Sequence, residues 1–167
     1  QNQAMGFQAG ANLTTGSYNN IMGAEAMENS TTASNCVAIG HDTLRQNDGN
    51  NNVAIGYQAL TANTTGSNST AVGRGALDAI TTASMNTALG YNAGSNVTGV
   101  ENICIGGQSG ANITSGTYNI TIGGYAGGYQ NSHTGQRNIS IGYQAGTDLT
   151  TASYSCLVGY QAGFNIT

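Results

Sequence analysis

A short motif close to Asn-x-Ala-Ile-Gly-Tyr-Gln-Ala-Gly/Leu returns about every 17 residues along the 167-residue chain. Repetition at a fixed period of this length is typical of a solenoid, in which each repeat forms one coil and buries its apolar face against neighbouring coils. Residues 1–167 are therefore interpreted as a single repeat array of about ten coils. The central glycine of each repeat, called the repeat glycine below, is found at Gly6, Gly23, Gly40, Gly56, Gly73, Gly90, Gly106, Gly123, Gly142 and Gly159.

The residues just before each repeat glycine have the pattern of a short β-strand. An apolar residue such as Ile55 or Leu89 directly precedes the glycine, and a β-former such as Val53 often stands three residues before it. These two positions share one face of a strand, because side chains alternate between faces. The position between them is mostly small, which suits a second backbone layer packed closely on the other face. The pattern predicts an all-β parallel solenoid, a β-roll or β-helix, with strands buried on both faces.

The rest of each coil reads as a corner followed by a polar turn. The repeat glycine allows a bend with positive φ where the strand ends. Asparagine recurs four residues before the glycine, as at Asn52 and Asn102, and stacked coils would bring these amides into a ladder. A 17-residue coil encloses a thin core, so we expect several copies to associate along their length through the Ala-rich and Val/Ile columns.

The charge pattern excludes nucleic-acid binding. There is no lysine, and three arginines stand against seven acidic residues, for a net charge of −4. Binding to nucleic acid needs a basic surface that neutralises phosphates, and this chain has none. No apolar run approaches the roughly 20 residues of a membrane-spanning helix, so no membrane insertion is expected.

No motif typical of catalysis or metal binding occurs. His41 and His133 occupy unrelated places in the repeat and are interpreted as solvent-facing turn residues. No Ser/His/Asp grouping has a motif around it, and the repeat of calcium-binding rolls is missing. Cys36, Cys104 and Cys156 fit no zinc spacing and are interpreted as small buried residues without intrachain disulfides. We therefore expect no catalytic residue, no metal ligand and no cofactor.

Nine Asn-x-Ser/Thr sequons occur, and five of them share one place, six residues after the repeat glycine. One interpretation is that Asn-x-Thr is favourable turn chemistry repeated along the chain, which Asp148-Leu-Thr in the same place supports. The other interpretation is an exposed row of glycan acceptors. The five candidate acceptors are Asn12, Asn29, Asn96, Asn112 and Asn165.

Two segments carry a family resemblance. Residues 52–60 read Asn-Val-Ala-Ile-Gly-Tyr-Gln-Ala-Leu, followed by Thr-Thr-Gly-Ser-Asn at 64–68, and residues 86–94 read Asn-Thr-Ala-Leu-Gly-Tyr-Asn-Ala-Gly. They resemble the repeats of phage-type tail-fibre proteins and are similar to the head repeats of trimeric autotransporter adhesins. The resemblance covers essentially the whole chain and implies a left-handed parallel β-roll, intertwined or laterally packed as a homotrimer. It includes no chaperone domain, anchor, stalk or receptor-binding tip, which leaves the kind of fibre open.

These observations favour a non-enzymatic structural fibre segment, the shaft or head of a tail fibre or similar attachment fibre. Because the chain begins and ends partway through a repeat, we expect it to be a segment of a longer fibre at an extracellular or virion surface. It would act as a rigid rod for attachment to a host or another surface. A bacterial cell-surface adhesin or a self-assembling extracellular filament is the alternative.

The expected partners are other copies of the chain, as a homotrimer and end to end in a filament, together with cell-surface glycans. Glycans would contact tyrosines that follow the repeat glycine, which otherwise form a stacked ladder supporting the coil: Tyr57, Tyr91, Tyr143 and Tyr160. Ice binding is a minor alternative that needs a flat, regular array. The threonines that would form it drift by one residue: Thr14, Thr31, Thr65, Thr82, Thr98 and Thr114.

Overall fold

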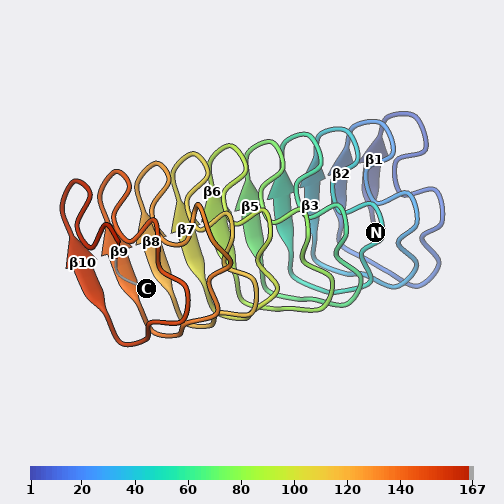
Figure 1. Ribbon diagram of the computed structural model, residues 1–167. Coiled ribbons are helices and arrows are strands. Elements are labelled where there is room, and N and C mark those ends of the chain that lie inside the picture. The colour runs from blue at the N-terminus through green and yellow to red at the C-terminus, as the bar shows by residue number, and fades with distance from the viewer. Residues whose placement is uncertain (166–167) are drawn as a thin grey trace.

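The computed structural model describes residues 1–165, which wind into a stack of coils with one strand in each coil (Figure 1). Ten strands of three residues form one parallel sheet, and they follow one another in sequence order. The fold is therefore an all-β parallel solenoid of about nine turns, and the described residues contain no helix. The strands are β1 (Gln3–Met5), β2 (Asn20–Met22), β3 (Val37–Ile39), β4 (Val53–Ile55), β5 (Thr70–Val72), β6 (Thr87–Leu89), β7 (Ile103–Ile105), β8 (Ile120–Ile122), β9 (Ile139–Ile141) and β10 (Cys156–Val158).

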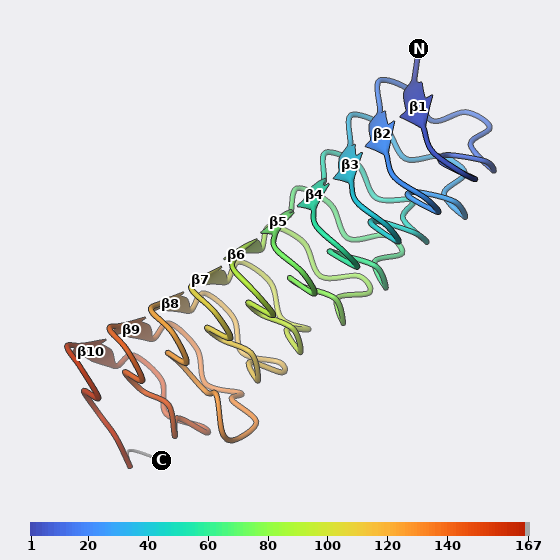
Figure 2. The same cartoon turned by 90° about the horizontal axis from the view of Figure 1, so that it is seen from above.

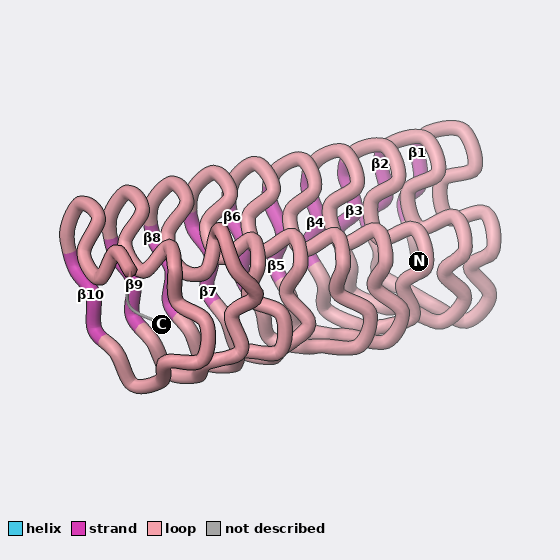
Figure 3. The backbone as a smooth tube through the Cα atoms, in the orientation of Figure 1, coloured by secondary structure: helices cyan, strands magenta, loops and turns pink. Residues whose placement is uncertain are grey.

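The strands lie on one side of the stack, and turns and loops form the remainder of each coil (Figure 3). Seen from above, β1 to β10 follow one another in a row, with β1 and β10 at opposite ends (Figure 2). Pairing keeps the register of the repeat even where the period changes. Ile39 pairs with Ile55 across a 16-residue coil, and Ile122 pairs with Ile141 across a 19-residue coil. Extra or missing residues are therefore absorbed outside the strands.

The repeat glycines form the expected corners. Their φ angles lie between 122° and 138°, a region that residues with a side chain rarely adopt. Space gives a second reason for glycine: a Cβ on Gly56 would lie 2.7 Å from the carbonyl carbon of Gly73 in the next coil. The corner thus brings two backbones into direct contact and ends the strand.

The asparagine ladder is confirmed. The Asn102 side chain is buried, and its Nδ2 donates to the Gly116 carbonyl at 2.9 Å. Its Oδ1 accepts from the backbone N–H of Asn119 at 3.0 Å and from the Asn119 Nδ2 at 3.2 Å. One side chain therefore pairs backbone groups of the turn and the strand entry, which would otherwise be buried without partners.

Cys36 interrupts this ladder, and a second asparagine compensates. Cys36 has no amide to donate to the turn carbonyl of the next coil, that of Gly49. Asn47, which follows the corner after β3 and is buried in the interior, donates its Nδ2 to that carbonyl at 2.7 Å. Its Oδ1 then accepts from the Asn52 Nδ2 at 3.0 Å. The buried polar network is thereby continued across the gap.

The interior is lined by small side chains, and one prediction about the strands is wrong. The middle residue of the strand, such as Ala54, is fully buried, as is the alanine three residues after the glycine, such as Ala59. The residue directly before the glycine points outward instead, and Ile55 is 36% exposed. The strands are therefore buried on one face only. The physical reason is the slim coil, whose interior has room for alanine but not for the isoleucine column.

One large side chain in most coils fills the remaining space, and it comes from either of two positions. In four consecutive coils it stands four residues after the repeat glycine, as with the fully buried Leu60. In four other coils that position is glycine and the side chain comes from three residues later, as with Gly146 and Leu149. A Cβ on Gly146 would lie 2.9 Å from Leu149 Cδ1, so the two positions compete for one volume. The Leu77 coil has apolar side chains at both positions, with Ile80 at the second, and the Leu44 and Leu60 coils place the buried amides of Asn47 and Asn63 there.

Positive φ also recurs at non-glycine residues, which sequence reasoning missed. It occurs two and four residues after the repeat glycine, as at Gln58 (58°) and Leu60 (52°), and five residues before it, as at Asn68 (60°). Each such residue costs roughly 1 kcal/mol. Burial of a leucine side chain contributes roughly 2 kcal/mol, which offsets the strain at Leu60.

The 19-residue coil places His133 in the core, which corrects its interpretation as an exposed turn residue. His133 pairs with Ile113 of the preceding coil and is fully buried. Its Nε2 lies 3.2 Å from the Asn138 Nδ2, and its buried Nδ1 has no hydrogen-bond partner among residues 1–165. The extra residues of this coil obscure the alignment that would have assigned His133 to a core position. His41 is exposed, as expected.

Replacing one repeat glycine is expected to be severe. Gly56→Ala combines a strained φ with a backbone clash, so we expect a loss of about 3 kcal/mol or more in the free energy of unfolding. Gly107→Ala is the control, because a Cβ there meets nothing within 4 Å. Chemical denaturation of both variants checks this expectation, and equal stability of the two would contradict the corner argument.

The two alternative core positions should compensate for each other. Met27→Gly removes a fully buried side chain and is expected to cost about 2–4 kcal/mol. Adding Ser30→Leu supplies the side chain from the second position and removes a buried hydroxyl that has no partner. The double variant should recover more than half of the lost stability. A thermodynamic cycle over the four proteins measures the coupling, and simple additivity would argue against a shared volume.

Acidification should lower the free energy of unfolding through His133. Burial lowers the pKa of His133, against a smaller opposite effect of a hydrogen bond with the Ala152 carbonyl. The neutral imidazole is favoured in the folded chain. Its stabilisation is therefore complete above the unfolded pKa of about 6.5 and falls below it, by at most about 1.4 kcal/mol per pH unit.

Denaturation at about pH 7.5 and 5.5 measures this effect. His133→Leu is the matched control, since Leu149 occupies the same place in the next coil. The variant should lose the part of the pH dependence that His133 causes. An unchanged pH dependence would assign the effect to other groups.

Candidate functional site

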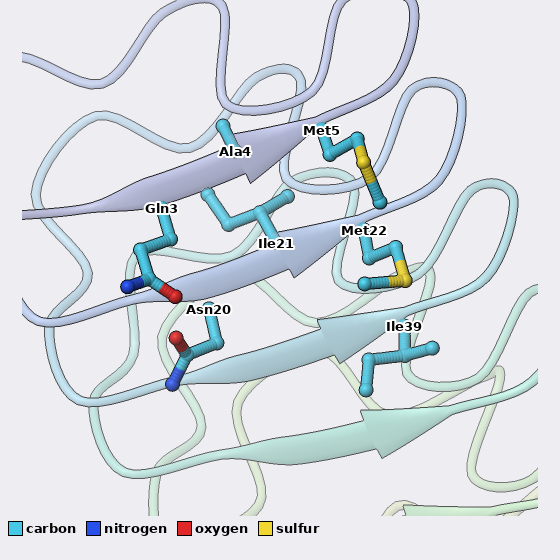
Figure 4. Close-up of a pocket in the computed structure, with 7 residues that line it drawn as sticks. All are labelled: Gln3, Ala4, Met5, Asn20, Ile21, Met22 and Ile39. Atoms are coloured by element: carbon cyan, nitrogen blue, oxygen red, sulfur yellow. The ribbon is translucent and has the colours of Figure 1, made fainter.

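The outer face of the sheet carries a continuous row of apolar side chains, called the outer row here. With the middle residue of each strand inward, the first and third residues point outward. Met5 is 61% exposed and Leu89 is 49% exposed. Figure 4 shows Met5, Met22 and Ile39 in a row along β1, β2 and β3, beside a hollow of about 280 Å³. The outer row consists of Met5, Met22, Ile39, Ile55, Val72, Leu89, Ile105, Ile122, Ile141 and Val158.

The outer row is large enough to be an interaction surface. Ten strands spaced ~4.8 Å apart, with three residues of ~3.3 Å each, give an outer face of about 480 Å². The outer row shares this face with the first residue of each strand, which is polar at Gln3, Asn20, Thr70 and Thr87. The largest apolar patch of a typical monomer covers about 300–600 Å² and is often functional. The apolar surface widens along β7, β8 and β9, where both outward residues of each strand are isoleucine. The small-residue column, also expected to contribute to association, lies inside the coil instead.

A ridge of aromatic and cationic side chains follows the repeat glycines. The Arg74 guanidinium carbon lies 5.7 Å from the ring centroid of Tyr57 and 5.6 Å from that of Tyr91, one coil away on each side. Tyr143 and Tyr160 stack with centroids 5.9 Å apart and planes inclined by 9°. The expected tyrosine ladder is therefore present in part, with Arg74 completing it between two tyrosines.

A second ridge with the same construction was not predicted. Arg137 lies between Tyr118 and Tyr154, with its guanidinium carbon 4.9 Å and 5.7 Å from the two ring centroids. All three residues stand five positions before a repeat glycine and have positive φ. Aligning this position across coils would have revealed the sandwich, because Tyr, Arg and Tyr occupy it in three consecutive coils.

The candidate glycan acceptors lie on the turn side of the stack, in short rows. Asn12 donates its Nδ2 to the Asn29 Oδ1 at 3.3 Å, and Asn96 donates to the Asn112 Oδ1 at 2.8 Å. The Asn112 Nδ2 in turn donates to the Tyr129 carbonyl. Asn165 is exposed. Three other sequon asparagines, Asn63, Asn119 and Asn138, are buried in the core.

The threonine column is more regular than predicted. Backbone hydrogen bonds pair Thr64 with Thr81 and Thr98 with Thr114, so Thr64 and Thr81, rather than the residues after them, belong to the column. Several of its hydroxyls bond the next coil, as Thr98 Oγ1 does with the Thr114 carbonyl at 2.7 Å. Asp48 takes the same place in one coil and interrupts the row. The column thus acts as a longitudinal brace and forms no uninterrupted array of the kind that ice binding requires.

Charged side chains gather at the corners after β2 and β3. Arg45 pairs with Glu28 at 2.7 Å, with Glu25 at 3.3 Å and with Asp42 at 3.4 Å. The His41 Nδ1 lies 3.2 Å from the Asp42 Oδ2. Glu25 and Glu28 are close in the sequence, whereas His41, Asp42 and Arg45 join them only because the coils stack.

The cysteines offer no activated nucleophile in the core. Cys36 and Cys104 are buried and free, as expected, and burial raises the pKa of both thiols, that of Cys104 to about 11. A thiol held in this state is not the reactive thiolate. Cys156 is free but exposed on β10, which corrects the expectation that all three are buried.

No helix among residues 1–165 has the length and apolar character needed to span a membrane. Comparisons of the chain with protein-family models, with curated proteins and with solved structures give no match.

Proposed function

We propose that this chain is a structural, non-enzymatic segment of an extracellular or virion attachment fibre, and that it acts as a rigid rod. The observation that carries the proposal is the outer row, an apolar surface that continues over all ten strands. A row of half-exposed Ile, Leu, Val and Met side chains gains stability when a second surface covers it, at about 25 cal/mol per Å² of apolar area. A surface of this shape, long and narrow, fits a parallel neighbour of the same length.

The proposed neighbour is another copy of the chain, in a parallel homotrimer with the outer rows facing one another. Identical copies have the same spacing between the side chains of the outer row, so their strands can lie side by side, coil by coil, along the whole stack. The resemblance of residues 52–60 and 86–94 to trimeric fibre and adhesin repeats supports three copies rather than two. End-to-end stacking of such units would lengthen the rod.

The rod owes its stiffness to bonds between coils. Backbone hydrogen bonds link consecutive coils at strands, corners and turns, and the buried asparagines add side-chain bonds along the same axis. Nine strand intervals of ~4.8 Å give a length of about 43 Å. The two Tyr–Arg ridges are the places at which we propose weak contact with cell-surface glycans, since tyrosine offers an apolar face with a polar hydroxyl.

Sedimentation equilibrium tests the trimer. The expected mass is about 51 kDa, three times the chain mass of 16.9 kDa. Ile55→Glu with Leu89→Glu puts two charges into the outer row and should yield folded single chains or unstable protein, because unpaired charges are costly in an apolar interface. The exposed Cys156 adds a readout, since mild oxidation of a trimer should cross-link two copies.

The matched control is Gln58→Glu with Asn92→Glu, which adds the same charges at the corners of the same two coils. Glu25 already occupies this place in another coil, so the control should remain a trimer. A wild-type chain that sediments as a folded single copy on dilution would refute the trimer. If the control dissociates equally, the added charge, rather than its place in the outer row, determines the oligomeric state.

A further inference from the structure

Two carboxylates occupy a place in the repeat where other coils have neutral side chains. Glu25 and Asp42 both stand two residues after a repeat glycine, in consecutive coils, with φ of 57° and 59°. Backbone bonds hold this position in register, and the Asp42 N–H donates to the Ala24 carbonyl at 3.1 Å. In other coils the position can form an amide ladder, as Gln161 does with Gln144 at 2.8 Å. Two carboxylates have no donor, so a cation is needed between them.

Arg45 supplies only part of the positive charge that these carboxylates require. Its close contacts, at 2.7 and 2.8 Å, are to Glu28, whereas Glu25 and Asp42 lie at 3.3 and 3.4 Å. Three carboxylates against one guanidinium leave a charge of −2 when His41 is neutral. A divalent cation matches this excess.

Asp42 provides an independent observation. It is only 8% exposed, and its buried Oδ1 faces the Arg45 Nη1 at 3.4 Å but accepts no hydrogen bond within residues 1–165. A buried carboxylate oxygen in this state is costly unless a further group binds it. Its other oxygen faces the His41 Nδ1 at 3.2 Å. The Asp42 side chain is thus directed at the space shared with Glu25 and His41.

The three side chains form a donor set for a metal ion. One ligand atom each from Glu25, His41 and Asp42 lies within 4.8 Å of the others. His41 stacks on Tyr57, with centroids 5.6 Å apart and planes inclined by 25°, which restricts the orientation of its ring. We propose that Glu25, His41 and Asp42 bind a divalent transition-metal ion of the zinc class, which joins the corners after β2 and β3.

The donor chemistry selects the class of metal. An imidazole nitrogen with two carboxylates suits zinc, cobalt or nickel, whereas calcium and magnesium prefer oxygen ligands alone. Three protein ligands leave a fourth position for water, and the partly exposed His41 keeps that position open to solvent. The site serves as a cross-link between coils and is independent of whether the chain is a fibre.

Calorimetric titration of the full chain with zinc chloride tests the site. Every protein in the series carries Cys156→Ser, because an exposed thiol binds zinc by itself. The expected result is one zinc ion per chain, a higher unfolding temperature, and a cobalt(II) complex with visible absorption bands. Three variants each introduce the residue that another coil has at the equivalent position of the repeat. They are His41→Ala (Ala24), Glu25→Gln (Gln8) and Asp42→Gln (Gln58). Each should weaken zinc binding about tenfold or more.

Two further variants separate a metal site from general electrostatics. Arg45→Thr copies Thr61 and removes the competing cation, so it should tighten zinc binding. His133→Leu removes the other histidine and should leave binding unchanged. If Asp42→Gln fails to fold by circular dichroism, Glu25→Gln and His41→Ala decide. The proposal is overturned if excess zinc does not bind the Cys156→Ser chain, or if it binds the His41→Ala variant of that chain equally well.

Discussion

Consecutive coils meet at the repeat glycines, where two backbones approach so closely that no side chain fits between them. A Cβ on any repeat glycine from Gly6 to Gly142 would lie less than 3 Å from backbone atoms of the next coil. This approach sets the separation of the coils at the distance of a hydrogen-bonded strand pair. Matching positions of the repeat are therefore superposed along the axis. The asparagine ladder, the threonine brace and the Tyr–Arg ridges all depend on that superposition.

The interior shows how small a solenoid core can be. Alanine from the strand and alanine after the corner bring the layers close, and usually one larger side chain fills the remaining volume. Either of two positions supplies it, at the cost of positive φ when the residue is Leu60 rather than glycine. Sequence variation inside the coil is therefore limited to exchanges that conserve volume. The corner and turn surfaces lie outside this core, and they differ from coil to coil.

Much of the architecture could be predicted from the period alone. The glycine corners and the Asn102-type ladder followed from stacking identical positions, and the structure confirms both. Alternation showed that Val53 and Ile55 share a face but could not tell which face was inside, because that depends on the width of the coil. The burial of His133 and the cluster around Arg45 could not be predicted for a different reason. Both depend on contacts between coils of unequal length or composition, which a single averaged repeat does not contain.

The 19-residue coil has a consequence for how such a molecule can be modified. Its additional residues lie on the turn side, while β8 and β9 keep their pairing and the outer row continues without a step. Length changes on that side are thus separated from the packing of the sheet. Foreign peptides inserted into successive turns would project from the molecule at intervals of one coil, ~4.8 Å. Binding sequences could thus be spaced along one edge of the array in steps slightly shorter than the 5.4 Å turn of an α-helix.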